Sequence, residues 1–252
     1  MKPHPCFLFD GSFAGFLNAI QKGIEESHPR VAFNPLFNTD TLPLFGSGVR
    51  IETKIQKAKR LWEDLGLLGT EIQKRVYFSF LHENAKLQSE IYIYVAHLFG
   101  PHIEGIEYLG VQAGKKLDIA VREVSRERDA QERVLSFKSN TDRLWYSEIR
   151  PKHDILPLLS RYCRSRFPSD PWLVVDANRK KRLSSVSGKL TLDACLQNVR
   201  PESGTYKSLQ RVTDTSNDDK TRWNTPPPLP ETPSLVNRKT QKWEAAWGQK
   251  AV

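Results

Sequence analysis

The apolar residues at the start of the chain form one short continuous run followed by a helical pattern. Cys6 to Phe9 is a four-residue apolar run, which predicts a short buried strand. Apolar residues then recur at helical spacing from Phe13 to Ile24, and Ser12 stands where a helix cap is expected. Residues 27–48 carry Pro, Gly and Asn and predict a loop, and Val49 to Thr53 alternates as a strand does.

The middle of the chain has the spacing of amphipathic helices. One helix is expected from Ile55 to about Gly66, and a longer one from about Glu71 to Phe99, which Gly100-Pro101 would end. A third is expected from Ile103 to about Gln131. Glycines at 110 and 114 mark places where this third helix is expected to be interrupted.

The pattern then returns to short strands. Val134 to Phe137 and Leu144 to Ile149 predict a hairpin, and Trp172 to Val175 predicts a buried strand. A helix is expected between them, from Ile155 to Phe167. Leu190 to Val199 allows one more helix. The predicted fold is α+β: a small mixed or antiparallel sheet with packed helices, forming one domain over residues 1–190.

The composition changes after that domain. Residues 191–252 are predicted to be a basic, Pro-containing, largely disordered tail, because Ser, Thr, Asn, Asp and Pro dominate from Arg200 onward. The run Pro226 to Pro230 favours polyproline II, as a stiff spacer or as a ligand for an aromatic groove. Trp243 and Trp247 stand four apart and suit a short helix that docks on a partner.

The net charge of +9 is unevenly distributed. Residues 1–114 hold 11 basic and 12 acidic residues, whereas residues 115–189 hold 18 and 10, a local net charge of +8. An excess of this size is an electrostatic footprint for nucleic acid, although a solubilising surface has the same composition. The predicted nucleic-acid contacts are Arg122, Arg126, Arg128, Arg161, Arg164, Arg166, Arg179, Lys180, Lys181 and Arg182.

Aromatic residues in the predicted C-terminal strands add a second possibility. Trp145, Tyr146 and Trp172 offer stacking faces for bases, but packing in the core is the alternative that we favour for each of them.

The sequence offers no recognisable motif for catalysis or cofactor binding. The sequence has no GxxxxGK[ST], GxGxxG, GxSxG or HExxH motif, and we expect neither a metal nor a cofactor. His153-Asp154 is better explained as a satisfied surface pair than as an acid/base pair, and Glu123 with Glu127 as helix salt bridges to neighbouring arginines. No catalytic residue can be named.

The strand, turn and helix at Asp10 to Ser12 would point backbone N–H groups at an anion. The same arrangement is common without a ligand, and a purely structural role is the interpretation that we favour. Three widely spaced cysteines predict reduced thiols rather than disulfides, and the apolar runs are too short for a signal peptide or a membrane span. We therefore expect a cytoplasmic protein with no membrane partner.

Two stretches resemble a known family. FDGSFAGFLNAI (Phe9 to Ile20) is similar to the opening of a bacterial family described as probable DNA metabolism proteins, whose domain has no assigned activity. LWYSEIRPKHDILPLL (Leu144 to Leu159), Arg166-Phe167 and PWLVVD (Pro171 to Asp176) resemble its C-terminal signature. The resemblance covers about residues 6–183. The family-motif residues here are Asp10, Gly11, Ser12, His153, Asp154, Pro171, Trp172 and Asp176.

The resemblance implies a role in DNA metabolism by association. Such domains are fused to uracil-DNA glycosylase-like domains, or occur beside a radical SAM protein linked to DNA modification or repair. This chain departs from the family where Asp129-Ala130-Gln131 replaces a His-Arg-Met run and where Arg150 replaces a carboxylate. We expect an accessory DNA-binding or adaptor protein; the alternatives are a nuclease or glycosylase, or a protein scaffold that uses the tail.

Overall fold

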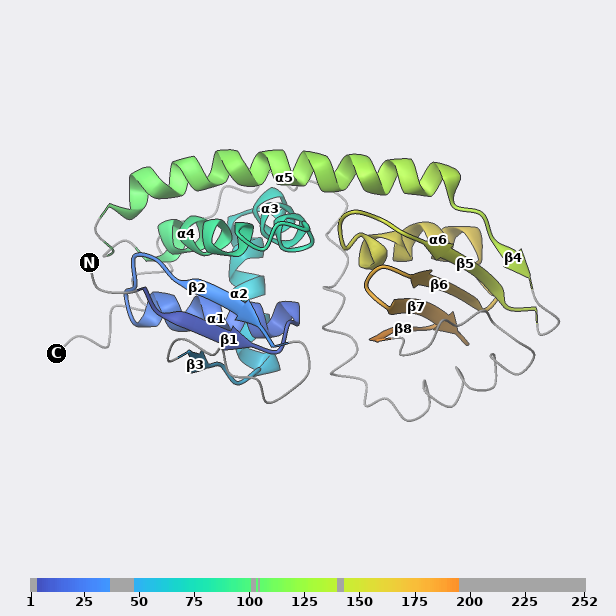
Figure 1. Ribbon diagram of the computed structural model, residues 1–252, viewed down its shortest axis with the longest axis horizontal. Helices are drawn as coiled ribbons and strands as arrows, with labels where there is room; N and C mark the ends of the chain where they lie inside the picture. The colour runs from blue at the N-terminus through green and yellow to red at the C-terminus, as the bar shows by residue number, and fades with distance from the viewer. Residues whose placement is uncertain (1–3, 37–47, 101–102, 104, 140–142, 195–252) are drawn as a thin grey trace.

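The structure is a computed structural model that describes residues 4–36, 48–100, 103, 105–139 and 143–194 (Figure 1). The fold is α+β, as the sequence predicted, with helices packed against two separate sheets. An N-terminal unit holds a three-stranded sheet and four helices, and a C-terminal unit holds a five-stranded sheet. The long helix α5 (Ile106–Val134) runs along both units (Figure 1).

The N-terminal sheet is built around the predicted first strand. β1 (Cys6–Phe9) pairs in parallel with β2 (Ala32–Pro35) on one side and β3 (Val49–Arg50) on the other. The region of β2 was expected to be a loop. β2 is a short edge strand, where a proline is tolerated because its missing N–H faces away from the partner strand.

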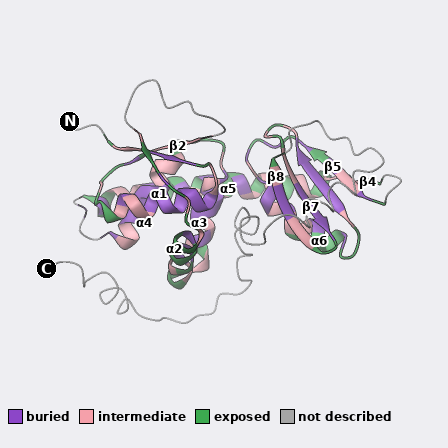
Figure 2. Cartoon of the chain, turned by 90° about the horizontal axis from the view of Figure 1, so that it is seen from below, coloured by how far each residue is buried: buried purple, intermediate pink, exposed green. Residues whose placement is uncertain are grey.

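Helices of the N-terminal unit pack against this sheet. α1 (Phe13–Glu25) begins as predicted, with Ser12 Oγ accepting a hydrogen bond from the Gly15 N–H at 2.9 Å. α2 (Ile55–Leu68), α3 (Thr70–Phe80) and α4 (Leu87–Phe99) follow. Buried aromatic residues from β1, α1, α2 and α3 meet in one core, in which Phe13 contacts the rings of Trp62 and Tyr77. Figure 2 colours most of α1 as buried.

The expected single helix from Glu71 to Phe99 was wrong. The chain leaves the helix at Leu81 and resumes it at Leu87. Local polar bonds stabilise the break: His82 Nδ1 accepts the Asn84 N–H at 3.0 Å, and Asn84 Oδ1 accepts the Lys86 N–H at 3.1 Å. Side chains that bond nearby backbone in this way compete with a continuing helix.

α5 is one continuous helix of 29 residues, about 43 Å long at 1.5 Å per residue. It is not interrupted at Gly110 or Gly114. A Cβ at Gly110 would lie 2.3 Å from His97 Cβ in α4, so this glycine permits close approach of the two helices. Val134, expected to open a strand, is the last residue of α5.

The C-terminal sheet has the order β4-β5-β6-β7-β8 and is mixed, because only β5 and β6 run parallel. Its strands are β4 (Lys138–Ser139), β5 (Trp145–Ile149), β6 (Trp172–Asp176), β7 (Lys181–Val186) and β8 (Lys189–Ala194). The crossover from β5 to β6 holds a 3₁₀ helix, η1 (Leu156–Leu159), and α6 (Ser160–Arg166). Trp172 and Val174 face these helices, and Leu173 and Val175 pack on the other side.

The helix expected from Leu190 to Val199 was wrong in the part that is described, since β8 is a strand up to Ala194. Ser187 and Gly188 join β7 to β8 with φ angles of 53° and 77°. Two successive positive φ angles define the hairpin turn that suits twisted antiparallel strands. The sheet thus continues past residue 190. Residues 195–252, with the rest of the predicted tail and Cys195, lie outside the described part.

Candidate nucleic-acid interface and the polar junction

Four basic residues of α5 form a single line along its outer face, which we call the basic stripe: Lys115, Arg122, Arg126 and Arg133. They are seven, four and seven residues apart, so at 3.6 residues per turn all four project in nearly the same direction. Each is exposed and has no ion pair among the residues that the structure describes. The opposite face of the helix is buried at Ile106, Ala113, Leu117, Ala120 and Val124.

The stripe contains two of the predicted contacts, Arg122 and Arg126. Arg128, the third predicted contact on α5, lies beside it and is neutralised. Its guanidinium is 2.6 Å from the Asp129 carboxylate and lies over the ring of Phe78 at 5.9 Å. Arg128 therefore contributes little free charge to the surface.

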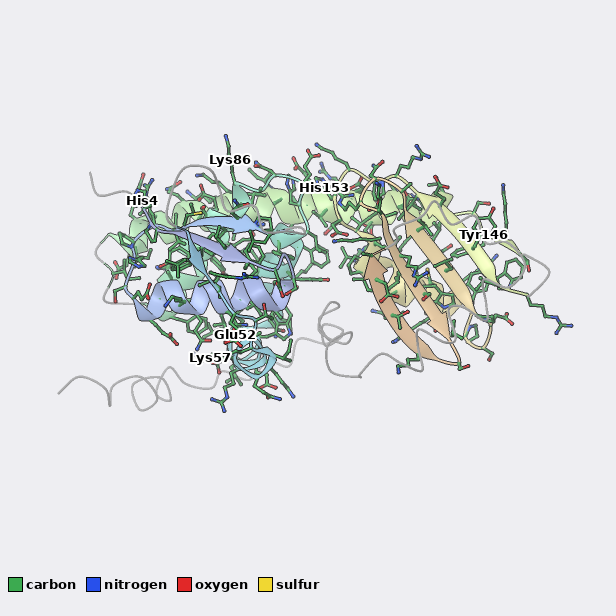
Figure 3. The ribbon with its side chains drawn as sticks, turned by 60° about the horizontal axis from the view of Figure 1, so that its bottom comes forward. His4, Glu52, Lys57, Lys86, Tyr146 and His153 are labelled. Atoms are coloured by element: carbon green, nitrogen blue, oxygen red, sulfur yellow. The ribbon has the colours of Figure 1, made fainter. Side chains whose placement is uncertain are left out.

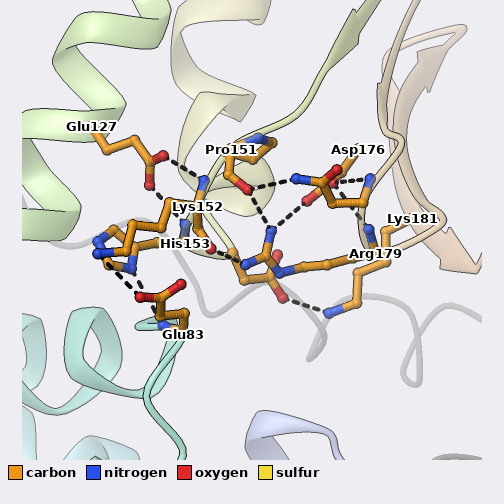
Figure 4. Close-up of polar contacts among 10 residues, drawn as sticks. Glu83, Glu127, Pro151, Lys152, His153, Asp176, Arg179 and Lys181 are labelled. Atoms are coloured by element: carbon orange, nitrogen blue, oxygen red, sulfur yellow. Dashed lines mark hydrogen bonds and ion pairs between the residues drawn. The ribbon is translucent and has the colours of Figure 1, made fainter.

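Most of the predicted basic turn supports the fold (Figure 4). Arg179 is only 23% exposed, pairs with the fully buried Asp176 carboxylate at 3.0 Å, and donates to the backbone oxygens of Pro151 and Lys152. Lys181 pairs with Asp154 at 2.5 Å. Arg182 lies 3.6 Å from Asp193. Of the four, Lys180 alone is exposed with no partner in the described part of the chain.

The remaining predicted contacts lie on α6. Arg161, Arg164 and Arg166 are all exposed, and α6 itself is anchored by Cys163, which is fully buried under the C-terminal sheet. Burial raises the pKa of the Cys163 thiol to about 12, so this cysteine is inert and serves packing.

The three aromatic residues considered as stacking faces serve the core. Trp172 is fully buried, and Trp145 stacks on Phe167 with ring centroids 5.2 Å apart. Tyr146, labelled in Figure 3, packs against the small core on the face of the C-terminal sheet opposite α6. An aromatic residue that was not considered, Tyr108, is 72% exposed on the outer face of α5.

A second cluster of polar groups joins the two units, and we call it the polar junction. It comprises the α3–α4 loop (residues 81–86), residues 123–127 of α5, and the loop at residues 150–155. Figure 3 shows His153 where the two units meet. Asp154 N–H donates to the Leu81 carbonyl across it at 2.8 Å.

Two glutamates of α5 fasten this junction. Glu127 accepts the N–H groups of Lys152 and His153 with its two carboxylate oxygens, at 2.5 and 2.8 Å. Glu123 is 2.8 Å from His82 Nε2, and this hydrogen bond lowers the pKa of Glu123. The expected salt bridges from these glutamates to neighbouring arginines are not what the structure shows.

His153 is buried rather than part of a surface pair with Asp154, so that interpretation was wrong. Only 3% of His153 is exposed, and its ring stacks on His82 at 4.2 Å between centroids. Burial, followed by the neighbouring His82, lowers the pKa of His153. Lys152 turns outward to Glu83 at 3.1 Å, and this carboxylate raises the pKa of Lys152.

The composition of the junction raises the question of a metal ion. Potential ligand atoms of His82, Glu123 and His153 lie within 4.8 Å of one another. However, the Nδ1 atoms of both rings accept backbone N–H groups, from Asn84 and Glu83. In a neutral ring the proton must then be on Nε2, whereas a histidine that binds a metal through Nε2 needs it on Nδ1. The hydrogen bonds of the two rings therefore do not favour a metal ion held through Nε2.

In the turn between β1 and α1, the carboxylate of Asp10 takes the place that a bound anion could occupy. Asp10 Oδ1 accepts from the Ser12 N–H at 2.9 Å and from Ser12 Oγ at 2.6 Å, while Asp10 Oδ2 accepts from Thr53 Oγ1 at 2.8 Å. Gly11 permits this turn with a φ of 79°. The Asp10 carboxylate thus occupies the helix N-terminus and ties β1 to the segment that follows β3.

Among the helices that the structure describes, none combines the length and apolar character needed to cross a membrane.

Comparison with known protein families gives a match. A family model described as a domain of unknown function, DUF4130, matches residues 85–249. This range contains the basic stripe, two of the three segments of the polar junction and the whole C-terminal sheet, but not the Asp10 turn. No curated protein and no solved structure matches the chain. The chain belongs to the DUF4130 family of domains of unknown function.

Proposed function

We propose that this protein is an accessory nucleic-acid-binding protein that acts as an adaptor in DNA base repair or modification. The observation that carries the proposal is the basic stripe on α5. Four aligned and exposed cations that have no ion pair with any described residue give a ridge of positive potential, which attracts a phosphate backbone.

The ion pairs and hydrogen bonds of the carboxylates support this proposal. In the described part of segment 115–189, every acidic residue except Asp170 already has an ion pair or a hydrogen-bonded partner. The local excess of positive charge is therefore left on exposed side chains. Outside the stripe it is carried by Lys138, Arg143, Arg164, Arg166 and Lys180.

Contacts of this kind hold phosphates and do not read sequence. Binding should be weakly specific and strongly salt-dependent, and each phosphate neutralised on duplex DNA should add about −0.9 to the log–log slope against salt. The proposed partner, a uracil-DNA glycosylase-like or radical SAM protein, rests on the family resemblance, and an adaptor needs no catalytic group of its own.

Fluorescence anisotropy with labelled duplex and labelled single-stranded DNA at several salt concentrations tests the proposal. Arg122→Ser with Arg126→Ser should weaken binding to unrelated sequences equally and flatten the salt slope. The control is Lys57→Ser with Arg60→Ser, which removes two exposed cations from α2, one of which, Lys57, lies 3.6 Å from Glu25. Undetectable binding by the wild type, or equal loss in both double variants, would contradict a specific role for α5.

The second candidate is an enzyme that acts on nucleic acid, such as a nuclease or glycosylase. It is favoured by the gathering of His82, Glu123 and His153 at one point. Against it, the His82 side chain is only 9% exposed and His153 is buried, so a substrate has little access to either ring. Turnover of plain or uracil-containing DNA that His82→Gln abolishes would establish the enzyme. The third candidate, a scaffold acting through the tail, depends on residues outside the described part.

A further inference from the structure

The outer face of α5 carries apolar side chains as well as cations. Tyr108, Val111 and Ile119 are 72%, 52% and 50% exposed. Tyr108 lies seven residues before Lys115, Val111 four before it and Ile119 four after it, so all three project in about the same direction as the basic stripe. Together with the basic stripe they form one row, in which Tyr108 and Val111 precede Lys115 and Ile119 lies between Lys115 and Arg122.

These apolar residues are not needed for the packing of α5. The buried face of the helix is complete without them, and a polar residue at any of the three positions would be compatible with the same packing. Neighbouring exposed apolar groups that sit among charged residues mark a contact surface. The ligand should therefore offer both negative charge and accessible apolar faces.

Duplex and single-stranded nucleic acid differ in whether they expose the apolar faces of their bases. A duplex keeps its bases stacked inside and presents phosphate and sugar to a convex ridge, so the cations alone would suffice. A single strand exposes the flat faces of its bases along with its phosphates, and proteins hold it with aromatic side chains set in a positive track.

We infer that the outer face of α5 binds single-stranded nucleic acid, with Tyr108 stacked on a base and the basic stripe on the phosphates. This inference rests on the proposed function and adds the class of ligand. Tyr108 stands at the N-terminal end of the row, so the strand would run along the helix from Tyr108 towards Arg133. Val111, which precedes Lys115, and Ile119, which lies between Lys115 and Arg122, would contact the bases or sugars.

An anionic membrane surface also combines charge with an apolar layer, but it fits this face less well. The apolar side chains are confined to residues 108–119, whereas the cations continue to Arg133. A helix that lies in a membrane interface has an apolar face along its whole length. That face of α5 is turned inward, where it packs against the protein.

The test compares a labelled oligothymidine with a duplex of equal length by fluorescence anisotropy, using the full chain. Tyr108→Ala should weaken binding to the single strand about tenfold and leave binding to the duplex unchanged. Tyr108→Phe keeps the ring and should retain wild-type affinity for the single strand. Leu67→Ala is the control, because Leu67 is 76% exposed but lies on α2.

The outcomes separate this inference from the proposed function. Loss of single-strand binding in Tyr108→Ala, with rescue by Tyr108→Phe, supports both. If Arg122→Ser with Arg126→Ser weakens binding but Tyr108→Ala affects both ligands equally or neither, the inference is wrong and the proposed function stands. Stronger binding to phosphatidylserine vesicles than to DNA, lost in Tyr108→Ala, would overturn both in favour of a membrane surface.

Discussion

The imidazole rings of His82 and His153 stack at 4.2 Å between centroids, with 35° between their planes, where the two units of the molecule meet. Each ring accepts a backbone N–H at Nδ1, so a proton can be added only by breaking that hydrogen bond. Burial also disfavours a charge on His153. The contact between the units therefore depends on a neutral His153.

The first prediction follows from the lowered pKa of His153. In the unfolded chain its pKa returns towards 6.5, so below that value the unfolded state binds more protons than the folded state. The stabilising contribution of neutral His153 is fully present above about pH 6.5 and is lost as the pH falls through the lowered folded-state pKa. The free energy of unfolding should fall by up to about 1.4 kcal/mol per pH unit in that interval.

Urea denaturation at half-unit steps from pH 7.5 to pH 5.5 measures this slope. His153→Asn removes the titrating group while its amide oxygen can still accept the Glu83 N–H. The variant should be less stable at pH 7.5 but should have a flatter pH dependence. Equal slopes for the variant and the wild type would show that other groups cause the loss of stability.

The second prediction concerns two adjacent basic residues with different roles. Arg179→Ser should lower the free energy of unfolding by about 3 kcal/mol, because it leaves the buried Asp176 carboxylate without its ion pair. Lys180→Ser removes the same charge from an exposed side chain and should change stability by less than about 0.5 kcal/mol. Chemical denaturation compares them, and similar losses in both would contradict the structural role of Arg179.

Much of the fold could be predicted because its signals are local. The apolar run and helical spacing around Ser12 give β1 and α1, and the run from Trp172 gives β6. The break between α3 and α4 was missed because apolar spacing continues across it, and only the short polar run from His82 to Lys86 marks it. β8 was missed because its apolar and polar residues alternate only over a short stretch, from Leu190 to Asp193, and the apolar residues up to Val199 also allow a helix.

The candidate sites likewise combine local features, which the sequence indicates, with tertiary contacts, which it does not. The basic stripe is a local feature of one helix, and Arg122 and Arg126 were predicted as contacts from charge alone. The polar junction joins His82, Glu123 and His153, which are 41 and 30 residues apart in the chain, and no local pattern indicates that they meet. Arg179 is neutralised by Asp176, three residues earlier, but its hydrogen bond to the Pro151 carbonyl is a tertiary feature that no local pattern indicates.

The third prediction compares the two glutamates that α5 sends into the polar junction. Glu127→Gln should lower the free energy of unfolding by about 1–2 kcal/mol, because an amide can accept only one of the two backbone N–H groups that the carboxylate holds. Glu123→Gln should cost less, because Glu123 is 48% exposed and water can replace its contact with His82. A larger loss in Glu123→Gln, measured by thermal or urea unfolding, would contradict this ranking.

The last prediction concerns Gly15, which stands against the Asp10 carboxylate. A Cβ at this position would lie 2.2 Å from Asp10 Oδ1 and 2.8 Å from Thr53 Oγ1. Gly15→Ala should therefore displace Asp10 from its hydrogen bonds and lower stability by about 1–3 kcal/mol, although alanine is intrinsically the better helix former. Gly114→Ala is the matched control within a helix: its nearest neighbour is the Tyr94 ring at 3.4 Å, so it should be neutral or stabilising.

A double-mutant cycle separates the clash from any general intolerance of α1. In Asp10→Ala, which has already lost the carboxylate, adding Gly15→Ala should cost much less than it does in the wild type, because the 2.2 Å neighbour is gone. Urea denaturation of the four proteins gives the coupling energy. If the two changes are additive, the close approach of Asp10 is not what requires a glycine here, and contact with Thr53 would be the remaining cause.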